Sequence, residues 1–259
     1  MARREDLFVV LLRRHGQTFA AELGIDLEGG GADARFQLCV AALLISARIS
    51  TRIAVAAARS LFDAGFTSAR RMRDASWQQR VDALGAGGYV RYDESTATYL
   101  GDTAELLLER YDGDLEALRE AAGREPAREY ELLQECKGIG TVGANVFLRE
   151  VQTVWHEVRP FADEAVTRAS EALGLPHTAR GLAGRLGDDD LSVLAAALVR
   201  ADLADELGAL KAGQELPPSA FQLASATKAE LLQLARERDL QGRSAMSRDE
   251  LADALRGGG

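Results

Sequence analysis

The sequence predicts an all-α protein, and three features of its patterning support this prediction. Apolar residues recur three or four positions apart along most of the 259-residue chain, with charged residues between them. No stretch shows the alternation of apolar and polar residues that is typical of a strand. Prolines are few, and Pro126, Pro160 and Pro176 fall between helical patterns, where helix-breaking residues belong. We therefore expect helices joined by short connections.

The most apolar segment is Phe36 to Ala47, FQLCVAALLISA, which is apolar on nearly every side. Such a segment predicts a buried helix at the centre of a helical domain. Amphipathic patterns with charges between their apolar residues follow it. We expect further helices over residues 50–64, 96–111, 115–122, 130–136 and 165–173.

Composition changes near the C-terminus. Residues 1–212 predict the main domain, and residues 213–224 predict an exposed linker that the pair Pro217-Pro218 stiffens. Residues 225–259 then predict a small helix–loop–helix module. Each of its two helices opens with a capping box, formed by Thr227 with Glu230 and by Ser247 with Glu250.

Charge and cysteine content narrow the function classes. The formal charge of −9 argues against a polybasic nucleic-acid binder, although a local basic face remains compatible with it. Cys39 and Cys136 stand far apart without a metal-ligand spacing, so we expect core thiols in a reducing cytosol and no metal site. The start, MARREDLFVVLLRRHG, has too short an apolar stretch, too flanked by arginine, for a signal peptide, and no run is long enough to span a membrane.

The glycine-rich stretch KGIGTVGANVF, residues 137–147, is the clearest candidate for a functional turn. Gly138 and Gly140 let the backbone take positive φ and approach a partner closely, while Ile139 between them anchors the turn in a core. Thr141 is a possible cap of the helix that follows. That helix would present free N–H groups and a positive dipole end to an anion. Taken alone, the motif predicts a helix boundary rather than a phosphate site.

Its neighbours carry a resemblance to a known family. Four segments follow one another in the order LLISAR, GGYVRYDESTATYL, KGIGTVGANVFL and PFADEAVTRASEALGLP. Over residues 30–176 this order resembles the helix-hairpin-helix (HhH-GPD) DNA glycosylases of the endonuclease III superfamily. The resemblance implies two helical lobes with a cleft between them. It also implies a hairpin at residues 136–140 whose amides hold a DNA phosphate, and a catalytic aspartate at Asp163.

The resemblance implies a base-excision repair enzyme that acts on double-stranded DNA. A glycosylase flips its target nucleotide and cleaves the bond to a sugar that becomes cationic. The carboxylate of Asp163 would stabilise that cation or orient the attacking water. The alternative interpretation of Asp163 is that it only caps the helix that starts at Glu164.

Two departures from the family pattern define the expected chemistry. Family members that also nick the backbone carry a lysine two residues after the second hairpin glycine, where this chain has Val142. We therefore expect a monofunctional glycosylase that forms no Schiff base there. Use of a lysine elsewhere for lyase chemistry is an alternative; Lys137 precedes the turn and fits a phosphate contact better. The family's four-cysteine motif is absent after Cys136, which predicts no iron–sulfur cluster, while a monovalent cation at the hairpin is compatible with the resemblance.

The resemblance also selects DNA-binding residues around the hairpin. They are Lys137, Gly138, Ile139, Gly140, Thr141 and Gly143 in the turn, with Arg48, Arg52 and Arg91 extending the same basic face. Arg48 stands where the family has a glutamine that enters the base stack, and we favour a phosphate contact over a wedge for it. Trp155 and His156 are weak candidates for the base pocket, with core packing as the alternative.

The tail has a resemblance of its own. Residues 228–256 resemble the small nucleic-acid-associated modules of the SAP and Rho N-terminal type, which implies a second, weak DNA contact; a solubilising cap or a protein-docking module is the alternative. A DNA-structure binder that has lost its chemistry is the main alternative for the whole protein. We expect a monomer in the cytoplasm, associated with the nucleoid.

Overall fold

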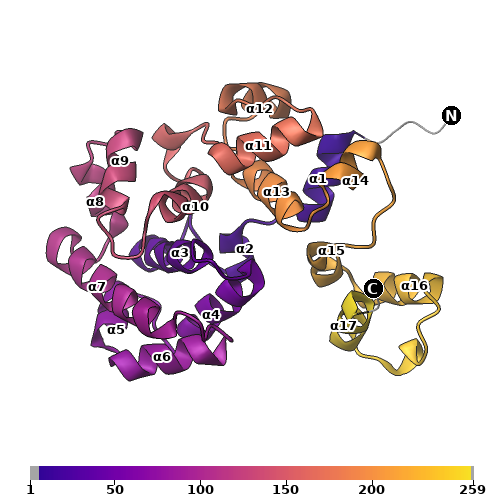
Figure 1. The fold of residues 1–259 in the computed structure, drawn as a ribbon, viewed down its shortest axis with the longest axis horizontal. Helices are drawn as coiled ribbons and strands as arrows, with labels where there is room; N and C mark the ends of the chain where they lie inside the picture. The colour runs from indigo at the N-terminus through magenta and orange to yellow at the C-terminus, as the bar shows by residue number, and fades with distance from the viewer. Residues whose placement is uncertain (1–5, 258–259) are drawn as a thin grey trace.

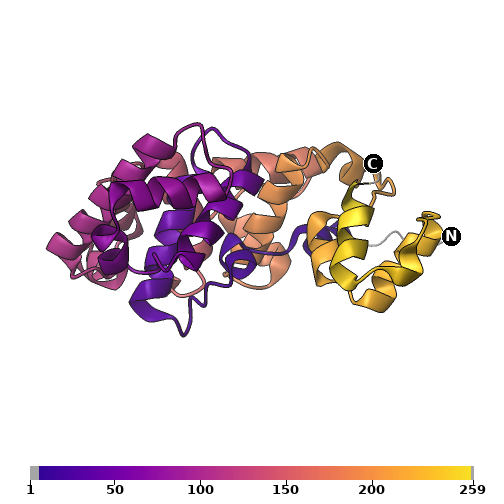
Figure 2. The same cartoon turned by 90° about the horizontal axis from the view of Figure 1, so that it is seen from below.

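The computed structural model describes residues 6–257, and Figure 1 shows these residues as helices joined by turns and loops, with no strand. The expectation of an all-α protein is confirmed. Three separate hydrophobic cores divide the helices into a first lobe, a second lobe and a C-terminal module. In both Figure 1 and Figure 2 the second lobe, orange apart from the indigo N-terminal helix, lies between the first lobe and the yellow C-terminal module.

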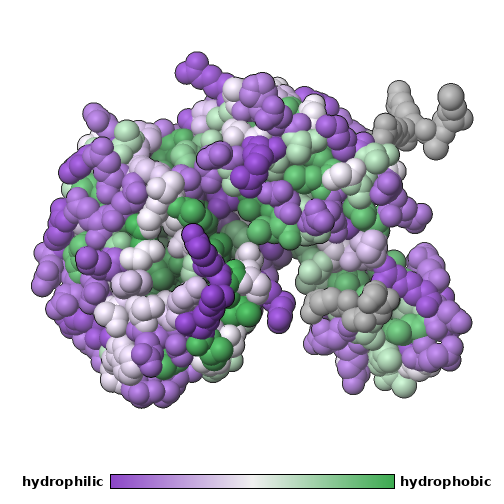
Figure 3. Space-filling model, in the orientation of Figure 1, coloured by the Kyte–Doolittle hydropathy of each residue, from purple (hydrophilic) through white to green (hydrophobic). Residues whose placement is uncertain are grey.

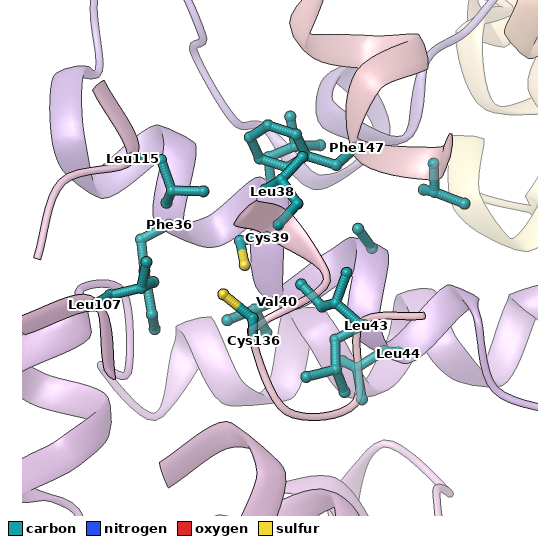
Figure 4. Packing of buried hydrophobic residues seen from close by; sticks show 14 of the residues in the cluster. Phe36, Leu38, Cys39, Val40, Leu43, Leu44, Leu107, Leu115, Cys136 and Phe147 are labelled. Atoms are coloured by element: carbon teal, nitrogen blue, oxygen red, sulfur yellow. The ribbon is translucent and has the colours of Figure 1, made fainter. Parts of the chain in front are cut away.

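The first lobe surrounds α3, which the sequence predicts as a central buried helix and which is almost fully covered by its neighbours. Figure 4 shows the core residues around α3, among which the sulfur atoms of Cys39 and Cys136 point toward one another. Both thiols are free and buried, and their mutual hydrogen bond together with burial raises the pKa of Cys39. The helices of this lobe are α2 (Phe19–Leu23), α3 (Gly31–Ile45), α4 (Thr51–Asp63), α5 (Ala69–Asp74), α6 (Trp77–Ala86), α7 (Asp93–Tyr111), α8 (Leu115–Ala121), α9 (Pro126–Leu133) and α10 (Thr141–Val151).

Most helices predicted from the sequence lie within a few residues of their expected ends. Two helices start earlier than expected: α3 begins at Gly31 instead of Phe36, and α9 begins at Pro126 and ends at Leu133 instead of covering residues 130–136. Proline suits the first position of a helix, because its missing N–H has no partner there in any case. Pro126 therefore opens this helix instead of preceding it.

The second lobe combines the N-terminal helix with helices from the far end of the main domain. Phe8 and Leu11 of α1 are buried in one core with residues of α11 and α13. The helices of this lobe are α1 (Leu7–His15), α11 (Glu164–Leu173), α12 (Ala179–Leu186), α13 (Ser192–Leu203) and α14 (Leu207–Ala212), and a short 3₁₀ helix, η1 (His156–Val158), leads into it.

Helix α10 joins the two lobes, because it packs against α3 in the first lobe and α13 in the second. Its buried Glu150 accepts hydrogen bonds from the backbone N–H groups of Phe19, at 2.6 Å, and Ala20, at 2.7 Å. These groups belong to the first turn of α2, so a side chain of α10 also satisfies the start of that helix. Helix α10, and with it the hairpin at its start, is thereby tied to the first lobe at both ends.

The C-terminal module starts earlier than predicted. Helix α15 (Ala220–Ser225) lies inside the expected linker, and its Leu223 is 1% exposed in the core shared with α16 (Lys228–Glu237) and α17 (Arg248–Gly257). The predicted capping boxes at Thr227 and Ser247 are both present, with reciprocal bonds to Glu230 and Glu250.

The connection before α15 is not the free linker that the sequence predicts. Arg14 of α1 donates to the carbonyl of Pro217 at 2.8 Å, and Ser219 donates its hydroxyl to the carbonyl of Arg14 at 2.5 Å. The same Arg14 forms an ion pair of 2.9 Å with Glu206. The connection is therefore held on the second lobe.

Among the residues that the structure describes, no helix is long and apolar enough to cross a membrane.

Candidate nucleic-acid interface

The glycine-rich motif forms the tight turn between α9 and α10. Gly138 has a φ of +82°, so positive φ is confirmed at this glycine. Gly140 has a φ of −93° and a ψ of −165°, an extended conformation that any residue adopts, so the same expectation is wrong for Gly140. Ile139 between them is 2% exposed and anchors the turn in the core of the first lobe, as predicted.

The start of α10 leaves backbone donors without partners. Gly140 is the N-cap residue, and Thr141, the suggested cap, is instead the first residue of the helix. Within residues 6–257, the backbone N–H groups of Gly140, Thr141 and Val142 have no hydrogen-bond partner. Because all three residues are exposed, these donors and the positive end of the helix dipole lie at the surface.

The turn is seated on α3 and α7. Thr103 of α7 donates its hydroxyl to the carbonyl of Lys137 at 3.0 Å. Gly138 lies so close to its neighbours that a Cβ there would come within 3.0 Å of Tyr99 and 3.2 Å of Leu43. Glycine is thus required at position 138 by its positive φ and by the lack of space for a side chain. The close approach of the Gly138 backbone to Tyr99 holds the turn against that side chain.

The predicted DNA-binding residues include four cations that are all exposed: Arg48, Arg52, Arg91 and Lys137. Within the described part of the chain, none of their side chains forms an ion pair or a hydrogen bond, and Arg91 only lies over the ring of Tyr92, 5.3 Å from its centroid. Many arginines elsewhere are paired with a carboxylate. These four charges therefore remain unneutralised although the protein as a whole is acidic.

A cavity of about 340 Å³ opens beside the turn, where three of the four family-like segments meet. The end of α3, the start of α7 and the hairpin all contribute to it, and Figure 3 shows hydrophilic side chains crossing a mixed surface over these helices. It is lined by Leu43, Ser46, Ala47, Arg48, Tyr89, Tyr92, Ser95, Thr96, Tyr99 and Gly138. Arg52 is not part of it and lines a second cavity of about 360 Å³ with Glu22, Arg200 and Phe221, among others.

Asp163 is the N-cap residue of α11 at the edge of the second lobe. Its Oδ1 accepts a hydrogen bond from the backbone N–H of Val166 at 3.1 Å, so the capping role is present. Its Oδ2 lies 3.5 Å from Nε of Arg149 on α10, and the Asp163 side chain is 7% exposed. The carboxylate therefore lies where the two lobes meet, with one oxygen turned toward a buried arginine.

The remaining sequence candidates differ in their surroundings. Val142 is 56% exposed on the first turn of α10, so nothing covers the position of the family's lysine. Trp155 is 0% exposed and packs edge-on against Phe147 with ring centroids 5.4 Å apart. It has no surface to offer a base, and the core-packing alternative is the correct one for Trp155. His156 begins η1 and is exposed.

Two acidic side chains, the buried Glu129 and the half-buried Glu157, lie near Trp155. Arg119 lies over the Trp155 ring, 5.5 Å from its centroid, and forms an ion pair with Glu157. Burial and the neighbouring Glu157 carboxylate raise the pKa of Glu129, which is 0% exposed, to about 8. Although burial opposes its charge, hydrogen bonds from Arg119 lower the pKa of Glu157 to about 2. Glu129 is therefore mostly protonated at neutral pH.

Sequence reasoning missed the aromatic side chains of the cavity and the partner of Asp163. Tyr89, Tyr92 and Tyr99 stand in the segment GGYVRYDESTATYL, whose place in the chain carries part of the family resemblance but whose tyrosines receive no role from it. Three tyrosines within eleven residues are nevertheless a visible signal. Arg149 offers no such signal, because its proximity to Asp163 depends on how α10 packs against the second lobe.

Comparison of the chain with protein-family models, with curated proteins and with solved structures finds no match. Within residues 6–257, no group of three or more His, Cys, Asp or Glu side chains is arranged to hold a metal ion. The hairpin, its surroundings and Asp163 are therefore the features that indicate the class of protein.

Proposed function

We propose that the protein is a monofunctional DNA glycosylase of the helix-hairpin-helix type, which removes a damaged or modified base from double-stranded DNA. The observation that supports it most is the hairpin, where free backbone donors at the start of α10 adjoin cations without ionic partners. A phosphate at this helix start would accept hydrogen bonds from Gly140 and Thr141 and gain from the dipole. Lys137 and Arg48 would contact neighbouring phosphates.

Asp163 supplies the chemistry in this proposal. Cleavage of the bond between base and sugar develops positive charge on the sugar, and a carboxylate at that position lowers the energy of the transition state. Asp163 comes from the second lobe and the hairpin from the first, and α10 connects the two. Capping of α11 does not require a charged residue, and a carboxylate close to a bound phosphate would repel it, so the charge at Asp163 favours a catalytic role over binding alone.

The absence of lyase chemistry follows from position 142. A Schiff base requires an amine, and Val142 has none. The expected product is an abasic site in an intact strand, which breaks only on later treatment with alkali or heat.

The C-terminal module adds a second, weaker contact to DNA in this proposal. Because Arg14 binds Pro217 and Ser219 in the connection before α15, the module is attached to the second lobe by contacts and not by a flexible linker alone. A fixed second contact raises the effective concentration of the enzyme at its site.

One observation favours a second candidate, a DNA-structure binder without catalysis. Both oxygens of Asp163 face protein groups, the Val166 amide and Arg149, and the side chain is nearly buried. A purely structural Asp163 would leave the hairpin as the only functional element.

A panel of duplexes, each carrying one modified base, separates the two candidates. Incubation in enzyme excess, followed by detection of released base and of heat-sensitive abasic sites, should reveal at least one substrate. Specific binding across the panel without base release would instead support the binder. Asp163→Asn protein serves as the control for contaminating glycosylases.

A further inference from the structure

Arg149 is a buried arginine whose donor groups are mostly unused. Among the side chains that the structure describes, three arginines are buried, and two of them, Arg14 and Arg80, donate hydrogen bonds from Nη atoms to backbone carbonyls. Within residues 6–257, neither Nη atom of Arg149 donates a hydrogen bond, and neither is enclosed by protein. The aliphatic part of this side chain is therefore covered, while most N–H donors of its guanidinium remain open to a ligand.

Two contacts of Nε fix the orientation of this guanidinium. Nε donates to the backbone carbonyl of Asn145, one turn earlier on α10, at 3.4 Å, and it lies 3.5 Å from Oδ2 of Asp163. The Asp163 side chain is 7% exposed, and its Oδ2 atom, like the Nη atoms of Arg149, is not enclosed. One ligand can therefore contact the carboxylate oxygen and the guanidinium donors together.

The chemistry proposed for Asp163 favours a positive group at this place. The sugar of the flipped nucleotide would lie at the carboxylate, and the phosphate groups of the same nucleotide are only a few bonds from that sugar. A carboxylate and a phosphate so close together repel one another, and the repulsion is stronger where protein excludes water. A guanidinium beside both groups offsets the repulsion, and its planar fork of donors matches the oxygens of a phosphate.

We infer that Arg149 binds phosphate at the reaction site: its Nη atoms hold a phosphodiester group of the nucleotide that is cleaved, while Nε faces the Asp163 carboxylate. The inference rests on the proposed function, because it needs a sugar at Asp163. Thr141 begins α10 and Arg149 lies about 12 Å further along the helix axis, so the hairpin and Arg149 hold different phosphates. The contact with Arg149 forms only when the nucleotide has left the duplex.

The test uses duplexes in which a pyrrolidine ring without a base replaces one deoxyribose. The ring nitrogen is cationic at neutral pH, so this duplex mimics the charged sugar of the transition state whichever base the enzyme removes. A matched duplex carries uncharged tetrahydrofuran at the same place. In further copies of the pyrrolidine duplex, a neutral methylphosphonate replaces the phosphate on the 5′ side, the phosphate on the 3′ side, or a remote phosphate.

The full-length parent protein should bind the pyrrolidine duplex more tightly than the tetrahydrofuran duplex. A methylphosphonate at one of the two flanking positions should weaken this binding about 10- to 150-fold, the range expected for a hydrogen bond to a charged group, and the remote one should have much less effect. Arg149→Gln should bind the unmodified duplex and that flanking-modified duplex with the same reduced affinity. Arg149→Lys, which keeps the charge without the fork, should recover part of the lost affinity.

Arg168→Gln is the matched control, because Arg168 lies on α11, which Asp163 caps, but is exposed and paired with Asp202 at 3.0 Å. It should keep the affinity of the parent protein and the full loss with methylphosphonate. Thermal denaturation shows whether each variant is folded. If Arg149→Gln does not fold, Arg149→Lys replaces it, and the loss at the flanking position should then be smaller than in the parent protein.

The outcomes separate this inference from the proposed function. A loss at the flanking phosphate that is as large in the folded Arg149 variant as in the parent protein would assign this phosphate to another group and overturn the inference alone. The absence of such a loss in the parent protein would overturn it too. Equal binding of the pyrrolidine and tetrahydrofuran duplexes would instead show that no anion acts at the sugar, and both proposals would fall.

Discussion

Replacement of Gly140 by leucine should weaken DNA binding without unfolding the protein. The backbone at Gly140 is extended, and a Cβ built there would meet nothing within 4 Å, so the fold accepts a side chain. The only structural cost is a poorer N-cap, about 1 kcal/mol or less. The new side chain would, however, project from the surface where a phosphate must approach the free amides of α10.

The magnitude follows from the hydrogen bonds to phosphate that the leucine side chain would prevent. Hydrogen bonds to a charged group contribute about 1.5–3 kcal/mol, so removal of one amide–phosphate bond should reduce affinity about 10- to 150-fold. The slope of log K against log salt should fall by about 0.9 for each phosphate that Lys137 or a neighbouring arginine no longer neutralises once the hairpin is blocked. Gly184→Leu is the matched control, because Gly184 in α12 also has open space around its missing side chain.

Fluorescence anisotropy of a labelled duplex over a series of salt concentrations measures both quantities, and thermal denaturation checks the fold. We expect the Gly140 variant to lose affinity and slope, and the Gly184 variant to match the parent. If folded Gly140→Leu protein binds with the parent's affinity and salt slope, the phosphate site is not at this hairpin.

The remaining predictions concern chemistry, pH and the C-terminal module. Borohydride should trap little covalent complex between the parent protein and abasic DNA. The variant Val142→Lys places an amine at an exposed position and should therefore give a trapped band. A strong band with the parent protein that persists in Lys137→Ala would mean that another lysine acts as the nucleophile. The pKa of Glu129 rises from 4.5 to about 8 on folding, so the free energy of unfolding should fall by up to about 1.4 kcal/mol for each pH unit between these values. In urea denaturation at several pH values, Glu129→Gln should show a smaller decline. An equal decline in the variant and the parent would contradict the raised pKa. Deletion of residues 219–259 should leave a folded protein with weaker binding to undamaged DNA but intact single-turnover activity, and complete loss of activity in a folded protein would argue against the division.

Local patterns in the sequence predict the helices well, because the forces that form them act over a few residues. The apolar run of α3, the capping boxes at Thr227 and Ser247, and the left-handed glycine at Gly138 are all properties of short stretches. Each predicts its own backbone conformation whatever the rest of the chain does. The core position of Ile139 follows from the same local argument.

Arrangements that depend on distant packing are not predictable in this way. The N-terminal helix α1 shares a core with α11 and α13, far along the chain, and its Arg14 binds the connection at Pro217. Nothing in the linker's composition reveals that partner. The same holds for the contact of Arg149 with Asp163, and for the cavity, which exists only because α3, α7 and the hairpin meet.

The most direct test of the central claim is the single-turnover rate of base release by Asp163→Asn, measured beside its DNA affinity. Asparagine still accepts the hydrogen bond from Val166, but it leaves the buried Arg149 without its counter-ion, so thermal denaturation has to show that the variant is folded. We predict a rate lower by orders of magnitude with equal or tighter DNA binding, because the lost charge acts on the transition state and repels phosphate. A folded variant that releases base at the parent's rate would show that Asp163 only caps α11.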